Sequence, residues 1–134
     1  MKVCAESFIK YLDSKNYHYS SREDKDGDVI VDFPYDGKVV KLVFAGDNGE
    51  YASLYMQYEK VPEDKRMKLI EVCNDLNCRF KWVTFFVDQD QDLMLQVDAK
   101  LSADTAADET MELMARMFNI ADKAKSDIMK AIYA

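Results

Sequence analysis

Residues 29–58 read VIVDFPYDGKVVKLVFAGDNGEYASLYMQY, and they are the clearest indication of fold class in the chain. Asp36-Gly37 separates two apolar runs that alternate with a period of two, which is the strongest short-range signal for a β-hairpin. Asp47-Asn48-Gly49 turns the chain again, into a third alternating run over residues 51–58. With a weaker, polar strand from Tyr17 to about Arg22, the pattern predicts a meander of four antiparallel strands.

Amphipathic helices are predicted on both sides of this meander. From about Lys2 to Lys15, apolar side chains recur at helical spacing, which predicts a helix that packs one stripe on the sheet and ends at Asn16. Pro62 suits the first turn of a second helix, which ends near Asn77-Cys78. From Asp104 to Ala134 a wide apolar stripe predicts a long closing helix that is buried against more than one element.

Two further strands are predicted between the second and third helices. They run from Phe80 to Val87 and from Leu93 to Leu101, and a polar turn joins them. The element order is therefore a helix, three or four strands, a helix, two strands and a helix. This order predicts an α+β fold in which helices pack on a twisted antiparallel sheet of five to six strands. The length of 134 residues predicts a single domain over residues 1–134.

The charge balance limits the kinds of partner that the chain can bind. Its 25 acidic and 18 basic residues give a net charge of −7. Nucleic acids and anionic membranes bind basic surfaces, so we expect neither as a partner. No stretch approaches the ~20 apolar residues of a transmembrane helix, and the first residues do not form a secretory signal. We therefore expect a cytoplasmic protein.

No pattern in the sequence indicates a catalytic or metal site. Asp24–Asp28 and Asp88–Asp92 carry carboxylates at alternate positions, as an EF-hand does, but both lack its later glycine and glutamate. A single histidine, His18, leaves no ligand set for zinc, and the three cysteines are expected to be reduced and buried. There is no nucleophile elbow and no phosphate-binding glycine loop. The sequence thus predicts no enzyme, no cofactor and no metal.

Four aromatic residues are the candidate partner-binding residues. Tyr51, Tyr55, Trp82 and Phe86 are predicted to point away from the core-facing side chains of their strands. Large aromatic side chains are rarely left on a sheet face that is open to water. Either the last helix covers this second face or another chain does, and the sequence pattern leaves both alternatives open.

A more specific signal begins at the second helix. Val61-Pro62-Glu63-Asp64-Lys65-Arg66 is followed by Leu69-Ile70, by Asn74-Asp75-Leu76-Asn77 and by the aromatic strand from Phe80 to Val87. This run resembles the YbjN family of bacterial sensory transduction regulators. In that family a helix that begins with proline, acidic and basic residues ends in Leu-Asn and leads to two strands and a closing helix. The resemblance implies that Asn77 caps carbonyl groups at the end of the second helix.

The resemblance also implies a fold like that of type III secretion chaperones. Proteins of that shape bind other proteins, commonly as homodimers, and offer no catalytic residues to transfer. The leading hypothesis is therefore a non-enzymatic domain that binds a protein or peptide, is chaperone-like or regulatory, and forms a homodimer. The alternative is a small-ligand sensor or an unrecognised enzyme, with a pocket of about 300 Å³ or more between the sheet and the C-terminal helix.

Overall fold

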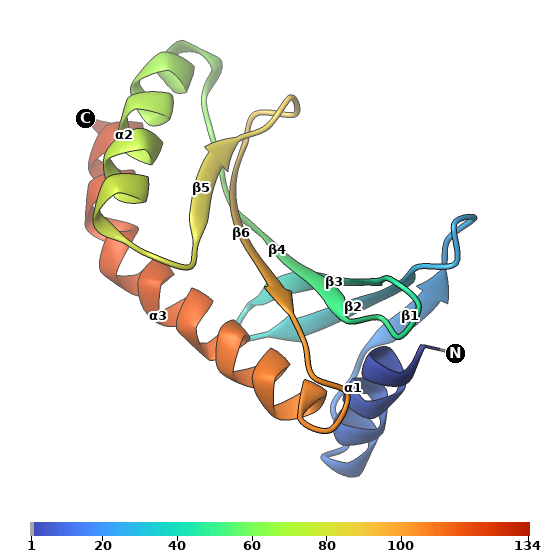
Figure 1. The fold of residues 1–134 in the computed structure, drawn as a ribbon. Helices are drawn as coiled ribbons and strands as arrows, with labels where there is room; N and C mark the ends of the chain where they lie inside the picture. Colours follow the sequence, from blue (N-terminus) through green and yellow to red (C-terminus); the bar gives the residue numbers. More distant parts are fainter. Residues whose placement is uncertain (1) are drawn as a thin grey trace.

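The structure is a computed structural model that describes residues 2–134. Three helices pack against a six-stranded antiparallel sheet (Figure 1). In chain order the elements are α1 (Val3–Ser14), β1 (Ser20–Glu23), β2 (Val29–Tyr35), β3 (Lys38–Ala45), β4 (Tyr51–Lys60), the 3₁₀ turn η1 (Glu63–Lys65), α2 (Arg66–Arg79), β5 (Thr84–Val87), β6 (Asp92–Lys100) and α3 (Ala106–Tyr133). The predicted α+β fold is confirmed, and four strands precede α2.

The strands lie in the order β1-β2-β3-β4-β6-β5. The predicted β2–β3 hairpin is confirmed, because Tyr35 pairs with Lys38 and the loop between them has φ angles of 48° at Asp36 and 79° at Gly37. Such left-handed values are those of the tight hairpin turns that match the twist of the flanking strands. Since β6 returns to pair with β4, the short strand β5 forms one edge of the sheet and β1 forms the other.

One face of the sheet carries the core. Alternate residues of each long strand are buried on it, and the paired residues Leu42 and Leu54 are fully inaccessible. α1 packs Phe8 onto this face, with ring centroids 6.5 Å from Phe33 and 5.7 Å from Phe44. The stripe of α1 that the sequence predicts to face the sheet therefore does so, and it adds an aromatic cluster to the core.

α3 crosses the same face of the sheet and connects the other two helices. In Figure 1 the first turns of α3 lie beside α1, and the last turns of α3 lie beside α2. Its Phe118 ring lies 5.0 Å from the ring of Tyr35 in β2. Although α3 has 28 residues, no helix within residues 2–134 is long and apolar enough to cross a membrane. In the described part of the chain, helices thus cover one face of the sheet, and no element covers the other.

The strand predicted from Phe80 to Val87 is shorter than expected. β5 begins at Thr84, because Trp82 has a φ angle of 80° and interrupts the extended backbone. A left-handed conformation is rare for a residue with a bulky side chain. The interpretation of Trp82 as a strand residue was therefore wrong, and the residue lies instead in the bend between α2 and β5.

Two other boundaries also differ from the prediction. The first strand covers Ser20–Glu23 and not Tyr17–Arg22, because the amide of Tyr17 still donates to the carbonyl of Leu12 at the end of α1. Asn16 reverses the chain there with a φ angle of 58°, which confirms it as the end of the first helix. Pro62 precedes the 3₁₀ turn η1, so α2 itself begins four residues later than predicted.

The three cysteines are free thiols but do not share one environment. Cys4 and Cys73 are buried, as predicted, whereas Cys78 is exposed near the end of α2, where the prediction was wrong. Burial raises the pKa of Cys4, and it raises the pKa of Cys73 to about 11. The thiolate is the reactive form of cysteine, so burial protects these two residues both sterically and chemically.

We expect Ellman's reagent to modify one thiol rapidly in the native protein at pH 8, and three in denaturant. At that pH a group with a pKa near 11 is ionised in only about one molecule in a thousand. Mass spectrometry of the labelled protein should place the rapid modification on Cys78, and Cys78→Ser should abolish it. Rapid modification of all three thiols without denaturant would contradict the burial described here.

Candidate functional site

The candidate site lies on the face of the sheet that the helices leave open. Along β4, Leu54 and Met56 are fully buried against the helices, whereas Tyr51 is 56% exposed and Tyr55 is half-buried. Val39 of β3 is also 56% exposed on this face. Within residues 2–134 the last helix packs on the opposite face from these side chains, although its first half borders a hollow beside Trp82 at the edge of the sheet.

Strand pairing brings three of the four predicted site residues onto this open face. Tyr51 pairs with Lys100 and Tyr55 pairs with Gln96, so both tyrosines lie beside β6. Phe86 of β5 lies on the other side of β6, where it pairs with Met94. The two tyrosines of β4 and Phe86 of β5 therefore lie on one surface, on either side of β6.

Trp82 approaches this surface from the edge of the sheet. It lies just before β5, its side chain is 67% exposed, and its left-handed backbone costs on the order of 1–2 kcal/mol. With Asp98 of β6 it lines two hollows, one of about 500 Å³ that reaches the first half of α3 and one of about 450 Å³ that reaches the end of α2. We call these two hollows together the Trp82 trough.

Asp98 was not predicted as a site residue, yet it lines both hollows of the trough. It accepts hydrogen bonds from Ser53 Oγ at 2.6 Å and from Gln96 Nε2 at 3.0 and 3.1 Å. Both donors are neutral, so they orient the carboxylate without neutralising it. The alternation of β6 could have placed Asp98 on the open face, but only the pairing of β4 with β6 shows which donors hold it.

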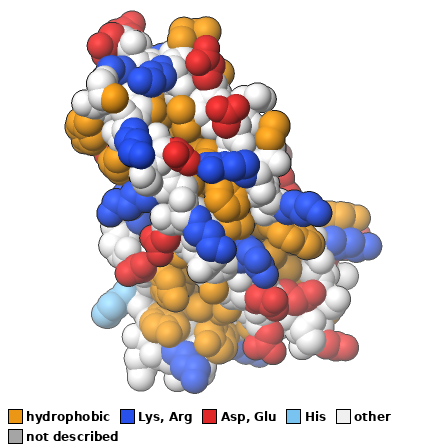
Figure 2. Space-filling model, turned by 90° about the vertical axis from the view of Figure 1, so that its left-hand side faces the viewer, with side chains coloured by type: hydrophobic (Ala, Val, Ile, Leu, Met, Phe, Trp, Pro, Cys, Tyr) orange, Lys and Arg blue, Asp and Glu red, His pale blue; other side chains and the backbone are white. Residues whose placement is uncertain are grey.

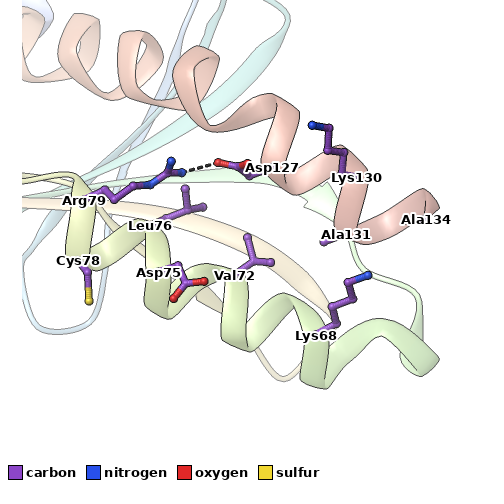
Figure 3. Close-up of a pocket in the computed structure, with 10 residues that line it drawn as sticks. All are labelled: Lys68, Val72, Asp75, Leu76, Cys78, Arg79, Asp127, Lys130, Ala131 and Ala134. Atoms are coloured by element: carbon purple, nitrogen blue, oxygen red, sulfur yellow. Dashed lines mark hydrogen bonds and ion pairs between the residues drawn. The ribbon is translucent and has the colours of Figure 1, made fainter.

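A separate groove of about 600 Å³ runs between α2 and α3 on the helical side (Figure 3). Val72, Leu76 and Ala131 give it an apolar floor. Arg79 and Asp127 point toward one another across it and form an ion pair. Figure 2 shows basic and acidic side chains interspersed on this side, with hydrophobic groups between them. The groove is thus already bridged by the chain's own charges.

A smaller hollow of about 280 Å³ lies between β4 and the middle of α3. Lys38 Nζ donates to the carbonyl oxygen of Tyr58 at 2.6 Å and lies 5.0 Å from the centre of the Tyr58 ring. Burial raises the pKa of the Tyr58 hydroxyl. This hollow is slightly smaller than the ~300 Å³ that the small-ligand alternative requires, whereas the hollow of about 500 Å³ between the end of β6 and the first half of α3 exceeds that volume.

The two acidic turns have one structure, and it explains their alternate carboxylates. Asp24 accepts the amides of Asp26 and Asp28 at 2.9 and 3.0 Å, and Asp88 accepts those of Asp90 and Asp92 at 3.0 and 2.9 Å. The first aspartate of each turn therefore holds the hairpin loop closed. No group of three or more potential metal-ligating side chains occurs in the described part of the chain, residues 2–134.

The sequence matches the model of the YbjN family over residues 5–133, under the description "Putative bacterial sensory transduction regulator". The chain belongs to the YbjN family. The resemblance seen from residue 61 onward is therefore confirmed for almost the whole chain. No curated protein matches it in sequence.

Two solved structures share the fold of this YbjN-family chain. The crystal structure of YbjN from E. coli has a TM-score of 0.60 and 14% identity, covering 92% of each chain. The type III secretion chaperone SycH from Yersinia pestis, solved in complex with a stable fragment of YscM2, has a TM-score of 0.58 and 12% identity, covering 92% of this chain and 98% of that chain. The predicted likeness to type III secretion chaperones is confirmed at the level of the fold.

The asparagine in the family-like Leu-Asn pair has a role other than the expected one. Asn77 does not cap the end of α2: its side-chain oxygen accepts the amide of Phe85 at 2.7 Å, and its side-chain nitrogen donates to the carbonyl of Phe85 at 3.0 Å. The side chain thus pairs with the outer edge of β5 as a neighbouring strand would. An unpaired strand edge can pair with another chain and lead to aggregation. In this YbjN-family chain, α2 therefore protects the edge of the sheet formed by β5.

Proposed function

We propose that the chain is a non-enzymatic, cytoplasmic domain that binds a protein or peptide, in a regulatory or chaperone-like role, through the open face of its sheet. The observation that carries the proposal is the exposure of aromatic side chains on that face. Tyr51 and Trp82 are exposed, and Tyr55 and Phe86 are half-buried on either side of β6. Tyrosine and tryptophan are enriched where proteins bind one another, because they bury much area at a small cost in conformational entropy.

Membership of the YbjN family and the shared fold are consistent with this proposal. The structure of SycH holds a fragment of another protein, which is a precedent for partner binding on this fold. We propose that the partner is either another protein or a second copy of the chain, the latter giving a homodimer. The mixed polar and apolar character of the face suits a surface that is exposed until the partner arrives.

Photo-crosslinking in cells tests the proposal. A photoreactive phenylalanine at Tyr55 should give a discrete covalent adduct, whereas the same residue at Tyr133, which is 77% exposed at the end of α3, should give none. Light scattering then separates the two kinds of partner, because a homodimer has twice the 15.5 kDa mass of one chain. Equal crosslinking at both positions, or none at either, would contradict a partner on the open face.

A further inference from the structure

The Trp82 trough differs from the rest of the open face in having one dominant apolar anchor. Trp82 is the only tryptophan of the chain, and two thirds of its side chain is exposed, at 67%. Leu101 and Leu113 line the trough on the α3 side. Both hollows are open to solvent and share Trp82 and Asp98, so their combined lining extends from the first half of α3 to Thr84 at the sheet edge. This shape suits an extended segment of chain better than an enclosed metabolite.

The charges around the indole favour a cationic group. Asp98 is the charged residue that lines both hollows, and neutral donors hold its carboxylate in place. Glu109 and Glu112 of α3 add two more carboxylates at one end. Two basic residues, Lys100 and Arg116, line the same hollow as these three carboxylates, so the net charge of its lining is −1. The ammonium group of Lys100 lies 6.0 Å from the centre of the Tyr51 ring. The net charge of −7 of the whole chain attracts a basic partner further.

We propose that the Trp82 trough binds an extended, arginine-bearing segment of a partner protein, with the guanidinium group between the Trp82 indole and the Asp98 carboxylate. A planar guanidinium stacks on aromatic rings and accepts a carboxylate at its edge, which are the two groups that the trough offers. The inference rests on the proposed function, because it names the chemistry of the partner at one end of the same surface. It also accounts for a tryptophan that is held exposed in a strained conformation.

Three synthetic peptides of seven residues provide the test. They are identical except for arginine, glutamine or glutamate at the centre, and they carry a fluorescent label for anisotropy. We expect affinity to fall about fivefold from arginine to glutamine and further to glutamate, the effect of one cation–π contact with a supporting charge. The arginine peptide should also change the emission of Trp82, and 0.5 M salt should reduce its advantage because salt screens exposed charges.

A matched pair of variants tests whether the carboxylate of Asp98 causes the preference for arginine. Asp98→Asn and Asp90→Asn change the net charge equally and lie on the same β5–β6 hairpin, but the side chain of Asp90 is exposed in the turn, away from the trough. Asp98→Asn should remove the preference for arginine over glutamine, and Asp90→Asn should keep it. Trp82→Gly should abolish binding without unfolding the protein, because glycine adopts a φ angle of 80° without strain.

Equal binding of the arginine and glutamate peptides, equal effects of the two aspartate variants, or unchanged Trp82 emission at saturation would each overturn the inference. Failure here is distinguishable from failure of the proposed function. If the crosslink at Tyr55 still captures a partner, the open face binds proteins but the trough does not select arginine. If the peptides bind as expected and no crosslink forms, the trough is a binding site of its own and the wider face is not.

Discussion

Replacement of Phe8 by alanine is expected to lower the free energy of unfolding by about 3–5 kcal/mol, the range seen when large aromatic side chains are removed from protein cores. Phe8 is fully buried and is the point at which α1 contacts the rings of Phe33 and Phe44. Truncation leaves a cavity that surrounding strands cannot fill, because their hydrogen bonds fix their spacing. The free energy of unfolding of a natural domain is about 5–15 kcal/mol, so this loss would be a large share of the total stability.

Urea unfolding followed by circular dichroism measures the effect of Phe8→Ala. Lys10→Ala on the exposed side of the same helix is the matched control. It removes only an ion pair with Glu6, 3.3 Å long, and should cost less than about 0.5 kcal/mol. If Phe8→Ala costs no more than this control, α1 is not packed on the sheet as described.

Asn77→Ala should have the second largest effect, about 1–2 kcal/mol of stability together with a newly exposed sheet edge. The substitution removes both hydrogen bonds that Asn77 makes to the backbone of Phe85. The freed amide and carbonyl groups can then pair with a strand of another molecule. We therefore expect faster hydrogen exchange at the Phe85 amide and self-association that increases with protein concentration.

Asn74→Ala is the control for this effect, because Asn74 is an exposed asparagine three residues before Asn77 in the same helix. It should leave exchange at Phe85 unchanged. Asn77→Asp should be intermediate, since the carboxylate keeps an acceptor for the amide of Phe85 but loses the donor for its carbonyl. Unchanged exchange at Phe85 in Asn77→Ala would show that the side chain does not protect the edge.

Much of the fold could be predicted because the signals are local. The alternation in residues 29–58 and the turn at Asp36-Gly37 specify strands and a hairpin whatever the rest of the chain does. Trp82 was misplaced because nothing in its neighbours indicates a φ angle of 80°; the bend is imposed by the connection from α2 to the sheet edge. Asn77 was misread for a similar reason, since its partner Phe85 is brought beside it only when β5 pairs with β6.

Three of the four candidate site residues were correctly placed on one side of their strands, since side chains alternate along any strand. The sequence could not show that β6 lies between β4 and β5, so it could not show that Tyr55 and Phe86 share a surface around Gln96 and Met94. Nor could it show that Ser53, in another strand, orients the carboxylate of Asp98.

By itself, the sequence determined the periodicity of each element, the turns and the family, because these depend on neighbouring residues and on patterned positions. The tertiary structure alone decided that all three helices lie on one side and that the aromatic face stays open. An apolar stripe requires burial, but it does not specify which of two sheet faces provides it. That choice depends on the pairing of β6 with β4, after which α3 crosses back over the core face. It leaves Trp82 and Asp98 exposed to solvent.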